Sequence, residues 1–352
     1  MPIPINISAS RGAAILDLSS WSTPTNVWLK IMEARQPGFC KKNNYELPVF
    51  EESAVLRWGK AFESAVIELA EKKQNSEIID REKFFSYGDS SLINKKITCH
   101  IDGLYEDVLG YDLHLINKIL HEGKTTSFFY YKDNFGEPGT DQVPVEYQVQ
   151  CQHQMICTGA EKVILSVLVF PKRVDEWEKN GLFIEGPDSY DYKIMNENMS
   201  VNLYPDLWAK TLDQMGYFYQ YEIKAHPELQ KIMIENYNEF WEKYVLTGQP
   251  PKPTNYDDIK MLIRNPVGTI VATENIERLM SEYKNIKSEI GTGGNLAKRT
   301  DQIKTKVLEW MNSMESIEDL DGKDAKKWIL KDRAGKRIGS YGKNKNGRLI
   351  FR

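Results

Sequence analysis

Residues 143–170 read VPVEYQVQCQHQMICTGAEKVILSVLVF and combine a polar helix with a strongly apolar strand. The helical part, 143–158, ends at Gly159, a residue type that commonly stops helices. The part from 163 to 170 is apolar at nearly every position, which is typical of a strand buried on both faces of a sheet. The segment therefore predicts a helix that leads into the central strand of an α/β core.

Earlier segments supply the rest of this core. Segment 52–73 has apolar residues at helical spacing, namely Val55, Trp58, Phe62, Val66 and Leu69. Strand-like stretches follow at 97–105 and 112–125, with a turn at Leu109-Gly110 between them. The order of helix, strands, helix and strand predicts an α/β fold with a central mixed β-sheet flanked by helices.

The later segments predict helices and a small β element. Helices are expected at 206–224 and 227–247, and a helical hairpin has arms at 276–290 and 303–314. The spacing in the hairpin also fits a coiled-coil partner site, although an intramolecular hairpin is favoured. The last thirty residues are rich in glycine and alternate in polarity, which is typical of short strands.

We expect three parts along the chain. They are an α/β domain at 1–250, a linker with the helical hairpin at 251–322, and a basic β-rich tail at 323–352. The tail holds eleven lysines or arginines against Asp324 and Asp332, a net charge of +9 within a total of −4. An acidic body with a basic tail fits a protein that holds a divalent metal in one place and phosphate in another, but a solvated tail without a partner explains the charge equally well.

Composition narrows the class of protein. The chain has 352 residues, of which 41% are hydrophobic and 27% charged, as expected of a globular protein. It has no apolar run long enough to cross a bilayer and no secretory signal pattern, so we expect no membrane association. The four cysteines lack paired spacing, which favours free thiols in a reducing cytoplasm over disulfides or a zinc site.

The triplet Glu122-Gly123-Lys124 is the first candidate for chemistry. Side chains alternate along a strand, so Glu122 and Lys124 project from one face while Gly123 offers its carbonyl. A carboxylate and an ammonium on one face can bind a metal and hold a water molecule beside it. Acid-x-Lys triplets also arise by chance, so the triplet alone is weak.

Asp102 strengthens the triplet, because it ends the preceding strand-like stretch and is followed by Gly103. Two carboxylates on neighbouring strands provide the hard oxygen ligands that Mg²⁺ prefers. Burying them side by side without a cation would be costly, which favours a metal. The alternative is a simple Asp-Gly turn.

Glu63 lies on the predicted 52–73 helix, one turn after Gly59. A glycine in mid-helix costs up to about 1 kcal/mol relative to alanine, which indicates a close approach or a function there. A solvent-facing helix charge is the alternative for Glu63.

The 143–158 helix carries Tyr147, Gln150 and Gln154 on one face. Buried amides need hydrogen-bond partners, and glutamines can bind metal-bound water or phosphate oxygens without adding charge. A solvated polar face is the alternative.

In this order the motifs resemble the lambda exonuclease family, also called YqaJ-like viral recombinases, within the PD-(D/E)xK nuclease superfamily. The matching motifs are Ser8-Ala9-Ser10-Arg11 with Trp21, Trp58-Gly59-Lys60-x-x-Glu63, Ile101-Asp102-Gly103-Leu104, Glu122-Gly123-Lys124-Thr125-Thr126-Ser127, and Tyr147-Gln148-Val149-Gln150 with Gln154-Met155. They lie within residues 7–250. The resemblance implies a restriction-endonuclease-like core and a 5′-to-3′ exonuclease acting on double-stranded DNA.

The resemblance also implies roles for individual residues. Asp102, Glu122 and Glu63, with the Gly123 carbonyl, would bind two Mg²⁺ ions, for which Mn²⁺ can substitute. Lys124 would orient the attacking water, and Gln150 would complete the catalytic set. Contacts to DNA or its 5′ phosphate would come from Ser10, Arg11, Thr125, Tyr147 and Gln154. Arg11 stands in for an arginine that the family places before the serine.

The resemblance further implies partners and a setting. It implies work beside a single-strand annealing protein in phage-type recombination, as a ring-like trimer or tetramer in the cytoplasm of a bacterial or phage-infected cell. Two alternatives stay open. One is a RecB-like repair nuclease or an endonuclease of the same superfamily, and the other is a non-catalytic DNA-binding assembly protein. The complete set of Asp102, Glu122 and Lys124 counts against the second.

Overall fold

The chain divides into two compact units in the computed structural model. Its described residues are 6–48, 52–87, 96–106, 118–186, 192–197, 199–263, 268–288, 294–314, 327–344 and 348–351. The first unit, here called the sheet unit, comprises Asn6–Ser20 and Phe50–Trp241. The second, here called the hairpin unit, comprises Met1–Ile5, Trp21–Val49 and Glu242–Arg352. The division into 1–250, 251–322 and 323–352 stays a prediction.

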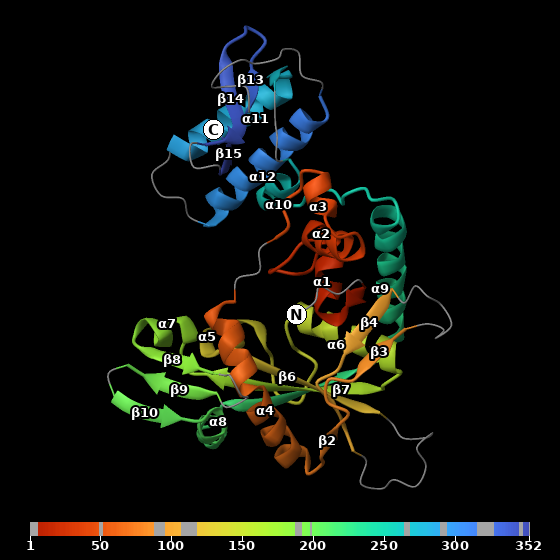
Figure 1. The fold of residues 1–352 in the computed structure, drawn as a ribbon, viewed down its shortest axis with the longest axis vertical. Coiled ribbons are helices and arrows are strands. Elements are labelled where there is room, and N and C mark those ends of the chain that lie inside the picture. The colour runs from red at the N-terminus through yellow and green to blue at the C-terminus, as the bar shows by residue number, and fades with distance from the viewer. Residues whose placement is uncertain are drawn as a thin grey trace. The chain divides into compact units, whose positions relative to one another are not determined.

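A five-stranded mixed sheet forms the centre of the sheet unit (Figure 1). Its order is β11 (Phe218–Lys224), β7 (Lys162–Phe170), β6 (Ile119–Ser127), β5 (Gly103–Tyr105) and β2 (Ile78–Ile79). Strands β6 and β7 are parallel, and the other neighbours are antiparallel. The predicted α/β core with a mixed sheet is confirmed, although residues 112–117 of one predicted strand lie outside the described residues.

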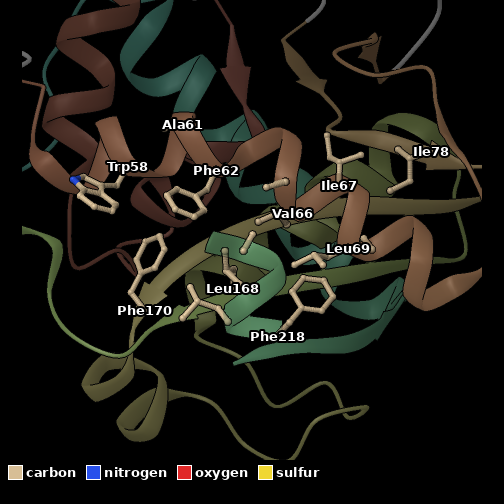
Figure 2. Packing of buried hydrophobic residues seen from close by; sticks show 14 of the residues in the cluster. Trp58, Ala61, Phe62, Val66, Ile67, Leu69, Ile78, Leu168, Phe170 and Phe218 are labelled. Carbon is tan, nitrogen blue, oxygen red and sulfur yellow. The ribbon is translucent and has the colours of Figure 1, made fainter. Parts of the chain in front are cut away.

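Strand β7 is buried on both faces, as its composition predicts. Leu168 and Phe170 pack against α4 (Ala54–Gln74), while Leu165 and Val167 lie in a second cluster with α6 (Val145–Thr158). Figure 2 shows the first of these clusters, in which the apolar side of α4 faces the sheet. The two helices therefore cover opposite faces of one sheet and can both reach the strand β6 beside β7.

The prediction of one helix at 206–224 is wrong in its second half. Helix α8 (Pro205–Gln214) is followed by Gly216 at φ +80° and then by strand β11. A left-handed glycine ends a helix readily, and the aromatic and β-branched residues after it favour a strand. Burial of Tyr221 and Ile223 against the core fixes this edge of the sheet.

The other elements of the sheet unit surround the central sheet. They are β1 (Ile7–Ser8), the 3₁₀ helix η1 (Ala9–Arg11), α1 (Gly12–Ile15), β3 (Phe84–Ser86), β4 (Ile97–His100), α5 (Phe128–Asn134), α7 (Val174–Lys179), β8 (Leu182–Glu185), β9 (Lys193–Asn196), β10 (Met199–Leu203) and α9 (Pro227–Phe240). A π-helical turn, η2 (Trp241–Val245), follows α9, so the helix predicted at 227–247 changes its winding near its end.

The hairpin unit has its own apolar core. Its elements are α2 (Pro24–Arg35), α3 (Phe39–Lys42), α10 (Tyr256–Leu262), β12 (Gly268–Val271), α11 (Glu274–Ser288), α12 (Gly294–Asn312), β13 (Lys327–Lys331), β14 (Arg337–Lys343) and β15 (Leu349–Phe351). Helices α11 and α12 pack on each other, and Trp328, Leu330 and Phe351 of the small sheet lie in the same core. The predicted helical hairpin and the small β element are confirmed, and the hairpin is intramolecular.

Candidate active site

Glu122 is a buried carboxylate held by three donors. Only 1% of it is exposed. It forms an ion pair with the Nζ atom of Lys124, two residues along β6. The Nε2 atom of Gln150 donates to Oε1 at 2.5 Å, and that of Gln154 donates to Oε2 at 2.5 Å. A buried carboxylate needs such partners, and these three contacts satisfy both of its oxygens inside the protein.

The amide stripe of α6 thus has a structural explanation. Gln150 and Gln154 are one helical turn apart, and both reach the same carboxylate on β6. The interpretation of this stripe as a solvated face is wrong for Gln154, which is 1% exposed. Tyr147 belongs to the same face and places its ring 5.6 Å from Lys124 Nζ, a cation–π contact.

Asp102 lies between β4 and β5, next to the middle of β6. Its Oδ2 atom accepts the backbone N–H of Gly123 at 2.8 Å. Burial and the nearby charge of Glu122 raise the pKa of Asp102. Burial alone would lower the pKa of Lys124, but the carboxylates of Glu122 and Asp102 outweigh it and raise that pKa. The structure therefore brings Asp102, Glu122 and Lys124 together.

Glu63 of α4 and Glu82 join Asp102 in a second group. One carboxylate oxygen from each of the three lies within 4.8 Å of the others. Burial and the charge of Glu82 raise the pKa of Glu63, although Lys124 opposes this. Glu82 was not predicted from the sequence, because nothing in its spacing from Asp102 or Glu63 marks it. It lies in a turn before β3, and only the folded chain brings it to the site.

The chemistry of these ligands fits a hard divalent cation. Carboxylate oxygens are the groups that Mg²⁺ prefers. The raised pKa values of Asp102 and Glu63 show that their ionised forms are costly without a compensating positive charge. The backbone N–H of Gly123 donates to Asp102. That the Gly123 carbonyl binds a metal stays a prediction.

The residues predicted to contact DNA lie around this site at different depths. Ser10 is exposed, and Arg11 is half-buried, which lowers the pKa of its guanidinium. Both lie on η1, which packs against α6. Thr125 is half-buried on β6. A Cβ atom added to Gly59 would lie 3.5 Å from the Oγ1 atom of Thr125. The close approach predicted at this mid-helix glycine is therefore an approach to β6.

No helix among the described residues is long and apolar enough to cross a membrane. The four cysteines, all within the described part of the chain, are free.

Comparisons with known proteins show what the chain is similar to. The sequence model of the YqaJ-like viral recombinase domain matches residues 5–161. An alkaline exonuclease from Laribacter hongkongensis is 14% identical, with a TM-score of 0.40, over 69% of this chain and 89% of that one. A phage-related exonuclease from Haemophilus somnus 129PT is also 14% identical, with a TM-score of 0.39, over 69% of this chain and 96% of that one.

A search of curated proteins found no match. The match to the family model spans the motif residues from Ser10 to Gln154 and agrees with the resemblance inferred from those motifs. Residues 5–161 of the chain therefore match the model of the YqaJ-like viral recombinase domain.

Proposed function

We propose that the chain is a Mg²⁺-dependent exonuclease that degrades linear double-stranded DNA from 5′ to 3′ in phage-type recombination. The observation that carries this proposal is that Asp102, just before β5, lies beside Glu122 and Lys124 of β6. Two carboxylates and an ammonium so arranged are suited to metal-assisted phosphodiester hydrolysis. The recombinase domain at 5–161 supports the same class of reaction.

The acidic residues would hold the metal. Asp102, Glu122 and Glu63 would offer oxygen ligands for two Mg²⁺ ions, and Mn²⁺ could take their place. Carboxylate oxygens of Asp102 and Glu63 lie within 4.8 Å of each other. When bound, the metal supplies an activated water and a positive charge near the departing 3′ oxygen.

The other residues act on water and phosphate. The side chain of Lys124 is 22% accessible, and its ammonium could orient a water and offset phosphate charge. Gln150 and Gln154 hold the Glu122 carboxylate in one orientation. Lys124 and the glutamines therefore prepare the site before substrate arrives.

DNA contacts complete the proposal. Ser10 and Arg11 would bind a 5′ phosphate through a hydroxyl, a guanidinium and backbone N–H groups. Tyr147 and Thr125 would lie against the DNA near the scissile bond. On the resemblance to the family alone, we also propose a single-strand annealing protein as partner, a ring-like trimer or tetramer, and a cytoplasmic setting.

Digestion of defined DNA tests the proposal. The substrates are linear duplex with 5′-phosphate ends, the same duplex with 5′-hydroxyl ends, and closed circular duplex, each with Mg²⁺ or with chelator. We expect release of mononucleotides from linear duplex only, faster from 5′-phosphate ends, and only with Mg²⁺. Efficient cutting of closed circles would support an endonuclease, and the lack of any cutting would refute the nuclease.

A further inference from the structure

Glu122 stands apart from the other acidic residues of the site. The three carboxylates within 4.8 Å of one another are those of Glu63, Glu82 and Asp102. We propose that Glu82 is a metal ligand, which together with Glu63 and Asp102 forms a cation site that does not require Glu122. This inference rests on the proposed function for the identity of the cation, and it assigns to Glu82 a role that the sequence motifs do not contain.

The donors on Glu122 are the first argument. Its Oε1 atom accepts from Lys124 and Gln150, and its Oε2 atom accepts from Gln154. Glu122 is therefore already compensated within the protein. A cation at Glu63, Glu82 and Asp102 leaves all three of these hydrogen bonds in place.

The ion pairs of the neighbouring basic residues are the second argument. Lys124 and Lys60 lower the pKa of Glu63, but each of the four basic residues below forms its ion pair with an acid outside the group of three. The pairs are Lys60 with Glu52, Arg81 with Glu71, Lys83 with Asp80, and Lys124 with Glu122. Three carboxylates within 4.8 Å repel one another unless a positive charge lies between them. A divalent cation is the group that fits this position.

The backbone holds Glu82 in place for this role. Its φ is +57°, in the left-handed region that costs a residue with a side chain roughly 1 kcal/mol. Its N–H donates to the Ile101 carbonyl at 3.0 Å, and the Ile101 N–H donates to the Lys83 carbonyl at 3.2 Å. These two bonds tie Glu82 to the residue directly before Asp102, so the two carboxylates keep their separation.

His121 supplies an independent sign of a missing ligand. It is fully buried, and neither ring nitrogen has a hydrogen-bond partner among the described residues. If Gly123 had a Cβ atom, that atom would lie 3.5 Å from His121 Cε1 and 3.7 Å from Asp102 Oδ2. The His121 ring and the Asp102 carboxylate therefore both lie close to Gly123. A buried ring nitrogen without a protein partner can exchange a hydrogen bond with a water molecule beside the Asp102 carboxylate.

Binding of Mn²⁺ without DNA tests the inference on the full chain. Calorimetry or electron paramagnetic resonance gives the number and the affinity of bound ions. Glu82→Gln should weaken one ion at least tenfold, while Glu122→Gln should retain that ion. Glu77→Gln is the matched control, because Glu77 is an exposed acid just before β2 and lies outside the group of three carboxylates. This control should bind Mn²⁺ as the original chain does.

Three results would overturn the inference. They are unchanged Mn²⁺ binding by a folded Glu82→Gln protein, loss of the same ion in Glu122→Gln, or no Mn²⁺ binding by the original chain. A melting curve in chelator shows that each variant is folded. The readout is separate from hydrolysis. Loss of an ion in Glu82→Gln by a chain that cuts no DNA would support the inference and refute the proposed function.

Discussion

The Oδ2 atom of Asp102 accepts a hydrogen bond from the backbone nitrogen of Gly123 at 2.8 Å. Gly123 lies between Glu122 and Lys124. Asp102 is therefore hydrogen-bonded to the backbone of the triplet that supplies the other two residues of the site. The bond fixes the orientation of the Asp102 carboxylate without using a side chain of β6. Loss of the acceptor would therefore disturb position as well as metal binding.

Substitutions at Asp102 and Lys124 should stop hydrolysis. Asp102→Asn keeps an acceptor for the Gly123 N–H but loses the ligand charge, and Lys124→Met loses the ammonium. We expect each to lower the rate by roughly 10²- to 10³-fold or more, because each removes charge stabilisation at the reacting phosphate. Single-turnover digestion of linear duplex measures this. Activity of Asp102→Asn near that of the original chain would refute the assignment.

Glu122 needs a different kind of variant. Glu122→Ala would leave Lys124, Gln150 and Gln154 without their acceptor, so it should destabilise the fold as well as stop hydrolysis. Gln154→Leu is the milder change, because it keeps Glu122 and removes only one of its three donors. We expect it to lower the free energy of unfolding by about 2 kcal/mol. Denaturant unfolding in chelator checks this. Gln148→Leu, a half-buried glutamine of α6 outside the Glu122 contacts, is the control, and an equal loss there would show that the effect is general.

The sequence predicted the order of the core elements and most of the site, because both depend on local patterns. Strand β7 was recognisable from its apolar run, and the alternation of β6 put Glu122 and Lys124 on one face. Strand β11 was missed because 206–224 was predicted as one continuous helix, although Tyr219, Tyr221 and Ile223 alternate with polar residues as in a strand, and β11 pairs with β7. Glu82 was missed because a left-handed turn and a pairing with Ile101 place it, and neither has a sequence signal.

Recognition of a 5′ phosphate should depend on Ser10 and Arg11. We expect Ser10→Ala and Arg11→Gln each to reduce the preference for 5′-phosphate over 5′-hydroxyl ends about tenfold, the value of one hydrogen bond to a charged group. Each variant is compared on both substrates, so the 5′-hydroxyl duplex is the internal control. An equal loss on both substrates would instead indicate a general effect on folding or on DNA binding.

His153 should make the protein sensitive to acid. Its Nε2 atom lies 2.9 Å from the Thr98 carbonyl, and burial lowers its pKa to about 4 despite this bond. Since an unfolded histidine titrates near about 6.5, the neutral ring stabilises the fold above that pH, and this contribution, up to about 3 kcal/mol, is lost as the pH falls toward 4.

Unfolding measured in chelator between pH 7 and about pH 4 checks this dependence. His153→Leu should reduce the loss of stability with acid, but not abolish it, because burial also lowers the pKa of His121. His100→Leu, at an exposed histidine of β4, should keep the original slope. The same slope in His153→Leu as in the original chain would contradict the assignment.

The basic tail should add DNA affinity through surface charge. Deleting the tail from Lys323 onward would remove Trp328, Leu330 and Phe351 from the core of the hairpin unit. A deletion variant would therefore not separate an effect on folding from an effect on DNA binding. Lys336 and Arg348 are exposed beside the strands of the small sheet, and their joint replacement by glutamine leaves that core intact. Each phosphate contact releases counterions, so the slope of log K against log salt should become shallower by about two.

A matched pair of changes separates tail charge from total charge. Lys41→Gln with Lys42→Gln removes two exposed charges from α3, and it should leave the slope unchanged if the tail makes the phosphate contacts. Turnover at saturating DNA should be the same in both double variants, because neither pair belongs to the proposed catalytic set. The rival role for the tail is assembly of an oligomer. If the Lys336 and Arg348 variant sediments as a smaller species with an unchanged salt slope, the tail holds subunits together and the DNA-contact prediction is wrong.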